Sequence, residues 1–296
     1  MKRFLCLVLC FLLLPVYAPA EETDISSVLP FAEYTFTGTS VKRKYDSDTL
    51  IYRVEKFKMG GVVCYLTKVW MRDPGQQIVK ETAEWQKNIQ LPGVMAKRIP
   101  DAALVINGSG YVSPTYPWIP ENYPGTNEDY YYTPLGSLTV TNGELYRRLE
   151  GVPFTGLTLE KDGLHMYIGA DNNDVLAAEP SQTWSFYDGC PMVLDGKDIL
   201  PDEWDFADKA ARRTVIGKVD NNNYIILSVT NEGGTGLTLR KCNWFLTERL
   251  SLEWAYDLDG GPSSALLCRN RGKKTFKLMF GGKAKDADVM GFRELP

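Results

Sequence analysis

With 296 residues, of which 44% are hydrophobic and 24% charged, the chain has a globular composition and enough length for one large domain or two small ones. This composition excludes a largely disordered chain. The formal net charge of -4 argues against a nucleic-acid-binding protein, because such proteins normally carry a basic face.

The first 20 residues have the pattern of a secretory signal peptide. Lys2 and Arg3 precede an apolar run over 4–14, and the small residues Ala18 and Ala20 offer cleavage sites. The run is too short to span a bilayer, which takes about 20 residues, and no later segment is apolar over that length. We therefore expect an exported protein, extracellular or periplasmic, with no transmembrane segment after cleavage.

Four cysteines follow this segment. Cys64, Cys190, Cys242 and Cys268 would enter an oxidising compartment, where up to two disulfides could form in any of three full pairings. Buried free thiols are the alternative, because three of the four lie in apolar surroundings. None belongs to a CxxC pair, so the cysteines give no reason to expect a metal.

The first elements after the signal peptide are strands. Residues 21–48 are expected to be a polar leader, and the folded domain starts at 49. Residues 50–57 alternate apolar and charged side chains, and 62–71 are rich in β-branched and aromatic residues, so both ranges are predicted as strands. Residues 80–89 have a helical composition.

The middle of the chain predicts a buried strand, a long loop and two hairpins. Residues 102–106 form the strand, and 111–134 form the loop, which is either an ordered flap over an apolar or sugar surface or a loose insertion. Hairpins are expected over 138–148, where Asn142 and Gly143 make the turn, and over 156–168.

The last third predicts further strands and one helix. Strands are expected over 191–199, which includes an Asp-Gly turn, and over 214–219, 224–229, 254–258, 265–267 and 276–280. Thr238 is the expected N-cap of the helix, and the tail after Gly281 is expected to fray. These elements predict an α+β fold. It is a single domain over 49–296, of mixed and largely antiparallel sheet with several hairpins and few helices.

Carboxylates are the expected catalytic groups. The sole histidine, His165, alternates with apolar residues in a predicted strand, so the sequence lacks the usual means of building a zinc site or a Ser-His-Asp triad. Asp259 follows a buried strand directly, and Asp257 lies two positions earlier on the same face of an extended chain. A close pair of this kind would raise one pKa.

The turn after Asp259 has two possible interpretations, an anion-binding turn and an ordinary hairpin turn. Gly260 and Gly261 with the hydroxyls of Ser263 and Ser264 can direct several donors toward one anion. The alternative is an ordinary hairpin turn, since Asp-Gly and Gly-Gly are common there.

Two other polar segments adjoin buried strands. Arg213 and Thr214 begin one strand, and the planar guanidinium of arginine suits a phosphate group. A surface arginine pair with Arg212 is the alternative. Asn107 and Gly108 end another strand, where a plain turn is the alternative.

These segments resemble the phosphodiester glycosidase family, in the family's order along the chain. The resemblance covers about residues 60 to 270 and rests on four segments: ALVINGSGY (103–111) is similar to the family's Asn-Gly-Gly-Phe-Phe segment, RTVIG (213–217) to its Arg-Thr-Ala-Ile-Gly segment, GLTL (236–239) to the start of the helix before the signature, and LDGGPSS (258–264) to its Leu-Asp-Gly-Gly-Gly-Ser-Ser signature.

The resemblance implies a hydrolase that cleaves a sugar 1-phosphodiester, or a phosphoglycan containing one, into free sugar and a phosphate monoester. It implies catalysis by carboxylates, for which Asp259 and Asp257 are the candidates, and no metal or cofactor is expected. Substrate binding would fall to Arg213, Thr214, Asn107, Gly108, Gly260, Gly261, Ser263 and Ser264. A glycan-binding protein without activity and a metal-dependent phosphodiesterase are the alternatives.

The chain departs from the family pattern at several positions. Pro262 replaces the third glycine of the signature and removes one backbone donor. Asp257 stands where the family commonly has asparagine. Other departures are Ser109-Gly110-Tyr111 for Gly-Phe-Phe, Gly189-Cys190-Pro191 for Phe-Gly-Pro, and Asn231-Glu232-Gly233 for Asp-Gly-Arg.

Overall fold

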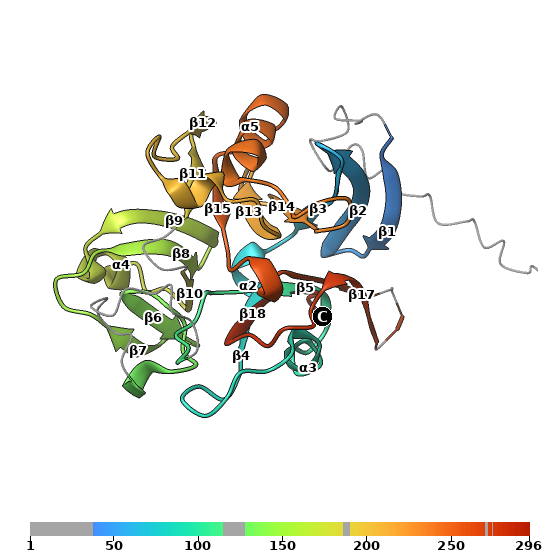
Figure 1. Ribbon diagram of the computed structural model, residues 1–296. Coiled ribbons are helices and arrows are strands. Elements are labelled where there is room, and N and C mark those ends of the chain that lie inside the picture. Colours follow the sequence, from blue (N-terminus) through green and yellow to red (C-terminus); the bar gives the residue numbers. More distant parts are fainter. Residues whose placement is uncertain (1–37, 115–127, 186–189, 270–271, 274) are drawn as a thin grey trace, which may run out of the picture.

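The protein is built from three antiparallel sheets that share one core (Figure 1). The computed structural model describes residues 38–296 apart from 115–127, 186–189, 270–271 and 274. The predicted signal peptide and the middle of the predicted 111–134 loop lie outside the described residues. The α+β prediction is confirmed, since the described strands far outnumber the short helices.

The first sheet is buried on both faces. In spatial order it contains β1 (Ser40–Asp46), β2 (Leu50–Met59), β3 (Val62–Met71), β14 (Asn223–Val229), β13 (Arg213–Lys218), β15 (Trp254–Asp257), β11 (Pro191–Leu194) and β12 (Lys197–Asp198). One face contributes Tyr52, Ile226 and Tyr256 to the shared core. The other face packs against the longest described helix, through Leu227 of β14 and Phe245 of the helix among others. Two buried faces explain the dense apolar sequence of β3 and β14.

The other two sheets close the core from the sides. The second contains β7 (Glu144–Arg148), β6 (Leu138–Thr141), β10 (Gln182–Trp184), β8 (Phe154–Glu160) and β9 (Gly163–Ala170). The third contains β17 (Phe276–Gly281), β16 (Ala265–Arg269), β5 (Ala102–Asn107), β18 (Asp288–Arg293) and β4 (Ile78–Thr82). In Figure 1 the second sheet is the green group of strands at the left, and α3 lies beside β5 of the third sheet.

The described helices are short. They are α2 (Pro74–Gln77), α3 (Pro92–Ala96), α4 (Asn172–Ala177) and α5 (Leu239–Arg249), with single 3-10 turns η1 (Glu128–Tyr130), η2 (Asp205–Asp208) and η3 (Gly261–Ser263). Thr238 caps α5 by accepting a hydrogen bond from the N–H of Lys241 at 3.1 Å, as predicted. Among the described residues, no helix has both the length and the apolar composition needed to cross a bilayer.

Two predicted elements were wrong. The expected helix over 80–89 starts instead inside strand β4, which pairs with β18, because that pairing overrides the helical propensity of Lys80 and Glu81. The tail after Gly281 does not fray. It contains β18, which lies between β5 and β4 in the third sheet.

An edge strand, two unpredicted elements and the state of the cysteines add to the sequence predictions. The end of the expected leader forms the edge strand β1, which pairs with β2. The pattern did not predict α4 and β10. Cys64, Cys242 and Cys268 are buried free thiols in the structure, and Cys190 is buried as well.

Candidate active site

The candidate site forms where strands of the first and third sheets end beside one another. The segment that follows β15 leaves the first sheet, makes the turn at η3 and enters the third sheet as β16. The end of β5 and the start of β13 are bonded to this segment through Asn107 and Thr214. The sequence placed polar residues at each of these strand ends, and the fold brings the ends together.

Asn107 fastens the three segments to one another. Its side-chain nitrogen donates to the carbonyl of Asp259 at 2.6 Å, and its side-chain oxygen accepts from the Thr214 hydroxyl at 2.7 Å and from the Ala265 N–H at 3.0 Å. The side chain is fully buried. Asn107 and Thr214 therefore hold the Asp259 turn in place through a satisfied buried network.

The turn itself is closed by internal hydrogen bonds. The Gly260 N–H donates to the Asp259 carboxylate at 2.8 Å, and the Gly261 N–H donates to the carbonyl of Arg212 at 2.9 Å. The glycine amides are thus engaged within the chain, and in this arrangement they do not form the open anion nest expected from the sequence. Gly261 has a φ of 55°, a backbone conformation that suits glycine.

Gly108 is required by a close approach of β18. A β-carbon at this position would lie 1.8 Å from a side-chain oxygen of Asp288. The backbone on either side is also engaged, because the Gly108 carbonyl accepts from the Asp259 N–H at 3.1 Å and the Ser109 N–H donates to Asp288 at 2.7 Å. The family-like glycine therefore allows the loop and the carboxylate to share this space.

Arg213 is directed into the protein. One terminal nitrogen donates to the Asp257 carboxylate at 3.3 Å, the other to the carbonyl of Lys209 at 2.8 Å, and the guanidinium lies 4.8 Å from the centre of the Phe206 ring. Both side chains of the ion pair are buried. Burial raises the pKa of Asp257 to about 7, although Arg213 opposes the increase. Each terminal nitrogen of Arg213, which was predicted to hold phosphate, thus already donates to a protein group, while its Nε has no partner among the described residues.

Arg212 has a different environment at the same turn. Its side chain is partly exposed, and it forms no hydrogen bond or ion pair with the described residues. Partial burial lowers the pKa of the guanidinium. Arg212 is therefore a cation beside the turn whose donors are not used within the described part of the chain.

Asp259 is the accessible carboxylate of an acidic cluster. The residue is partly exposed, whereas Asp257, Asp286 and Asp288 are each no more than 1% exposed. The pKa of Asp259 is raised to about 7, first by burial and also by the charge of Asp288, while the Ser263 hydroxyl opposes the increase. A carboxylate with this pKa is suited to proton transfer near neutral pH.

Sequence reasoning missed Asp286 and Asp288, since it assigned them to a frayed tail. A signal was present, because Asp288 directly precedes the buried run of β18, just as Asp259 directly follows a buried run. The many charged residues between 283 and 288 concealed it. Ser263 lies near both Asp259 and Asp286 and lowers the pKa of each, and the Ser264 hydroxyl is buried without a hydrogen bond among the described residues.

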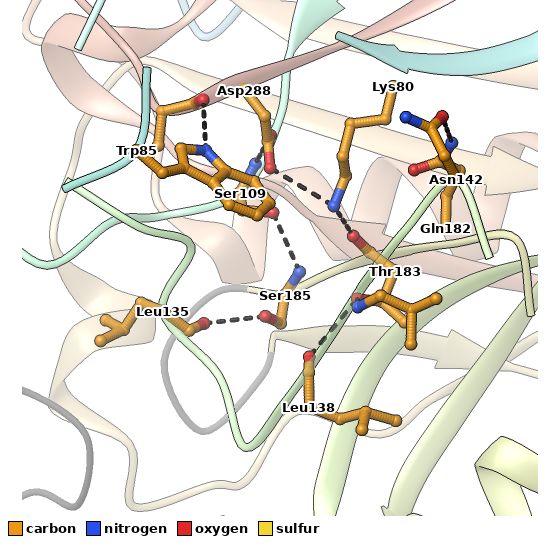
Figure 2. A network of polar contacts seen from close by, with 12 residues as sticks. Lys80, Trp85, Ser109, Leu135, Leu138, Asn142, Gln182, Thr183, Ser185 and Asp288 are labelled. Carbon is orange, nitrogen blue, oxygen red and sulfur yellow. Dashed lines mark hydrogen bonds and ion pairs between the residues drawn. The ribbon is translucent and has the colours of Figure 1, made fainter. Parts of the chain in front are cut away.

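Lys80 supplies the positive charge next to this cluster (Figure 2). Its ammonium group lies 3.5 Å from a carboxylate oxygen of Asp288 and donates to the carbonyl of Thr183 in the second sheet. It also lies 5.0 Å from the centre of the Trp184 ring. Burial lowers the pKa of Lys80, and Asp288 opposes the decrease. The Lys80 to Asp288 pair thus connects the second and third sheets at the site.

One group of side chains in the described part of the chain has a spacing that could suit a metal ion, and it belongs to the β8–β9 hairpin. Glu160, Asp162 and His165 place one ligand atom each within 4.8 Å of one another. The His165 ring is hydrogen-bonded to Asp162 at 2.7 Å. None of these residues makes a hydrogen bond to the Asp259 turn, so we assign them no part in the site.

Comparison with known proteins shows the family of the chain. The family model of phosphodiester glycosidases matches residues 101–292, which include every residue of the site except Lys80. A search of curated proteins gave no match. The chain belongs to the phosphodiester glycosidase family.

Solved structures share the fold at low identity. The chain is similar to the zebrafish N-acetylglucosamine-1-phosphodiester alpha-N-acetylglucosaminidase catalytic domain, described as auto-inhibited by its pro-peptide, with a TM-score of 0.62 and 16% identity over 92% of each chain. It is also similar to a hypothetical protein from Synechocystis, with a TM-score of 0.60 and 12% identity over 85% of this chain and 63% of that one. These similarities establish the fold.

Proposed function

We propose that the protein hydrolyses a sugar 1-phosphodiester at the glycosidic bond and releases a free sugar and a phosphate monoester. The family provides the reaction class. The observation that carries the proposal is the position of Asp259, the one partly exposed aspartate of the cluster, on a turn fixed by Asn107. The pKa of about 7 gives this carboxylate the protonation behaviour of a general base.

The proposed reaction does not require protonation of the leaving group. As the oxygen of a water molecule bonds to C1 of the sugar, the Asp259 carboxylate takes a proton from that water. The bond between C1 and the phosphate oxygen breaks, and its electron pair leaves with the phosphate. A phosphate monoester has a second pKa near 6, so it departs as a dianion far more readily than a sugar alcohol would.

Arg212 is our candidate for the phosphate group of the substrate. Each terminal nitrogen of Arg213 already donates to a protein group, Asp257 or Lys209, whereas the side chain of Arg212 makes no hydrogen bond within the described residues. Arginine binds phosphate through two parallel hydrogen bonds. This assignment replaces the one made from sequence, which favoured Arg213.

The first test is the Asp259→Asn variant with an aryl diester of a sugar 1-phosphate as substrate. The side chains are nearly isosteric, so the fold should be kept while kcat/KM falls about 100- to 1000-fold, the range for loss of one important electrostatic group. Asp202→Asn, at an exposed position, is the matched control and should keep full activity.

The pH dependence of the wild type belongs to the same test. Because the base must be ionised, kcat/KM should fall as the pH drops below about 7. A fully active Asp259→Asn protein would contradict the assignment. If the wild type turns over no member of a panel of such diesters but binds the glycan, the non-catalytic alternative is correct.

We further propose that the protein is exported, on the basis of the Lys2-Arg3 pair and the apolar run that follows. Exported material should begin shortly after Ala18 or Ala20, as measured by intact mass. Native protein that retains Met1 would refute cleavage.

A further inference from the structure

Asp286 is a buried carboxyl group with no counter-charge of its own. Its side chain is 1% exposed, and neither carboxyl oxygen has a hydrogen-bond partner among the described residues. The backbone is fixed, because its N–H and carbonyl pair with Gln90. An isolated carboxylate in such surroundings is strongly disfavoured, and a group in this position takes up a proton instead.

Asp288, two residues later, has the hydrogen bond and the ion pair that Asp286 lacks. It accepts the Ser109 N–H at 2.7 Å, and its other oxygen lies 3.5 Å from the Lys80 ammonium group (Figure 2). The lysine charge is therefore matched by the Asp288 charge. Lys80 is paired with Asp288, and no cation among the described residues is ion-paired to Asp286.

Two of the groups that face Asp286, the carboxylates of Asp259 and Asp288, make its ionisation harder still. Asp259 and the Ser263 hydroxyl approach from the turn at η3, Asp288 lies on the same segment, and Lys80 on β4 is paired with Asp288. Burial raises the pKa of Asp286 well above its usual value, and the charges of Asp259 and Asp288 raise it further. Ser263 lowers the pKa of both Asp259 and Asp286, which places its hydroxyl near both carboxyl groups.

We propose that Asp286 holds a proton while Asp259 is ionised, so that the site presents one carboxylate rather than two to an anionic phosphodiester. Asp286 is a positioning residue that acts through Asp259 and Ser263. This inference rests on the proposed function and specifies the protonation state in which that function operates.

The charge of the substrate gives the reason for such an arrangement. The phosphodiester brings one negative charge, and the departing phosphate monoester becomes a dianion as Asp259 takes the proton from water. A second carboxylate at Asp286 would repel both the bound substrate and the developing charge. Holding Asp286 neutral removes that repulsion without removing the base.

The first experiment compares the pH profiles of the wild type and Asp286→Asn, which mimics the neutral carboxyl group. In the wild type, kcat/KM should fall on the alkaline side through a rise in KM, to about a tenth at one pH unit above the midpoint of that fall. In Asp286→Asn the alkaline fall should be absent, while the acid side, set by Asp259, should stay. The exposed control Asp202→Asn should follow the wild type throughout.

The second experiment does not depend on turnover. A carboxyl group whose pKa is raised on folding binds more protons in the folded than in the unfolded protein, so it weakens the fold as the pH rises from about 4 toward the raised pKa. The Tm of Asp286→Asn relative to the wild type should therefore increase by several degrees between about pH 5 and about pH 8.

The two readouts separate the possible failures. A Tm difference that is constant over this range, or an alkaline fall that persists in Asp286→Asn, would overturn the proposed proton on Asp286. Absence of turnover in the wild type, with the Tm effect present, would overturn the proposed function and leave the protonated Asp286 supported.

Discussion

At the scale of single residues, two adjacent arginines have separate tasks. Arg213 is buried against Asp257 and the Phe206 ring, while Arg212 is partly exposed at the turn that carries Asp259. The sequence predicted that one of the two points inward but associated the inward one with phosphate. The ion pair of Arg213 with Asp257, 44 residues further along the chain, decides between the two arginines, and no local sequence pattern predicts that partner.

This division predicts opposite effects for the two substitutions. Arg212→Met should raise KM about tenfold or more with little change in Tm, because a charged hydrogen bond to phosphate contributes about 1.5–3 kcal/mol. Arg213→Met should lower the free energy of unfolding by about 3 kcal/mol, because it leaves Asp257 buried without its partner. Steady-state kinetics and urea unfolding measure the two effects.

A matched double variant tests the structural half of this assignment. Adding Asp257→Asn to Arg213→Met should recover part of the lost stability, since it removes the unpaired carboxylate. If Arg213→Met instead leaves the unfolding midpoint unchanged and raises KM, the buried ion pair has no structural role and Arg213 contacts substrate.

At the scale of elements, the loop after β5 depends on the close approach of β18. Gly108→Ala would place a methyl group 1.8 Å from the Asp288 side chain, which is held on its other side by Lys80. We expect the unfolding free energy to fall by about 1–3 kcal/mol, as at other overpacked sites. We also expect kcat/KM to fall by more than this loss of stability explains, because the Asp259 N–H is bonded to this loop.

Gly93 provides the control for that substitution. It lies in α3, and a β-carbon there would meet only a Leu267 methyl group at 3.6 Å, an ordinary contact. Gly93→Ala should therefore keep both stability and activity. Equal behaviour of the two variants in thermal unfolding would show that the crowding at Gly108 is relieved at no cost.

The elements that the sequence predicted well are those whose pattern is local. The hairpins over 138–148 and 156–168 follow from turn residues and alternation, and the α5 start follows from Thr238. Strands β4 and β18 were missed because charged residues needed at the site dilute their pattern. Lys80 and Asp288 are both buried and form an ion pair with each other across two strands.

At the scale of the whole molecule, the three sheets define a site that no single sheet contains. The first supplies Arg213 and Asp257, the third supplies Asn107 and Asp288, and the second accepts the Lys80 ammonium through Thr183. The fold class and several of these residues could be predicted from sequence and family resemblance. The part of Asp286 and Asp288 in the acidic cluster was not predicted, because it is created by the tertiary pairing of β18 beside β5.

Cleavage of the bond between C1 of the sugar and the phosphate oxygen is tested most directly by turnover in water enriched in oxygen-18. Mass spectrometry of the phosphate monoester, with the reaction stopped early, shows where the water oxygen goes. Attack at C1 places the label in the sugar and leaves the phosphate monoester unlabelled. A labelled phosphate product would show cleavage of the bond between phosphorus and oxygen and would contradict the proposed reaction.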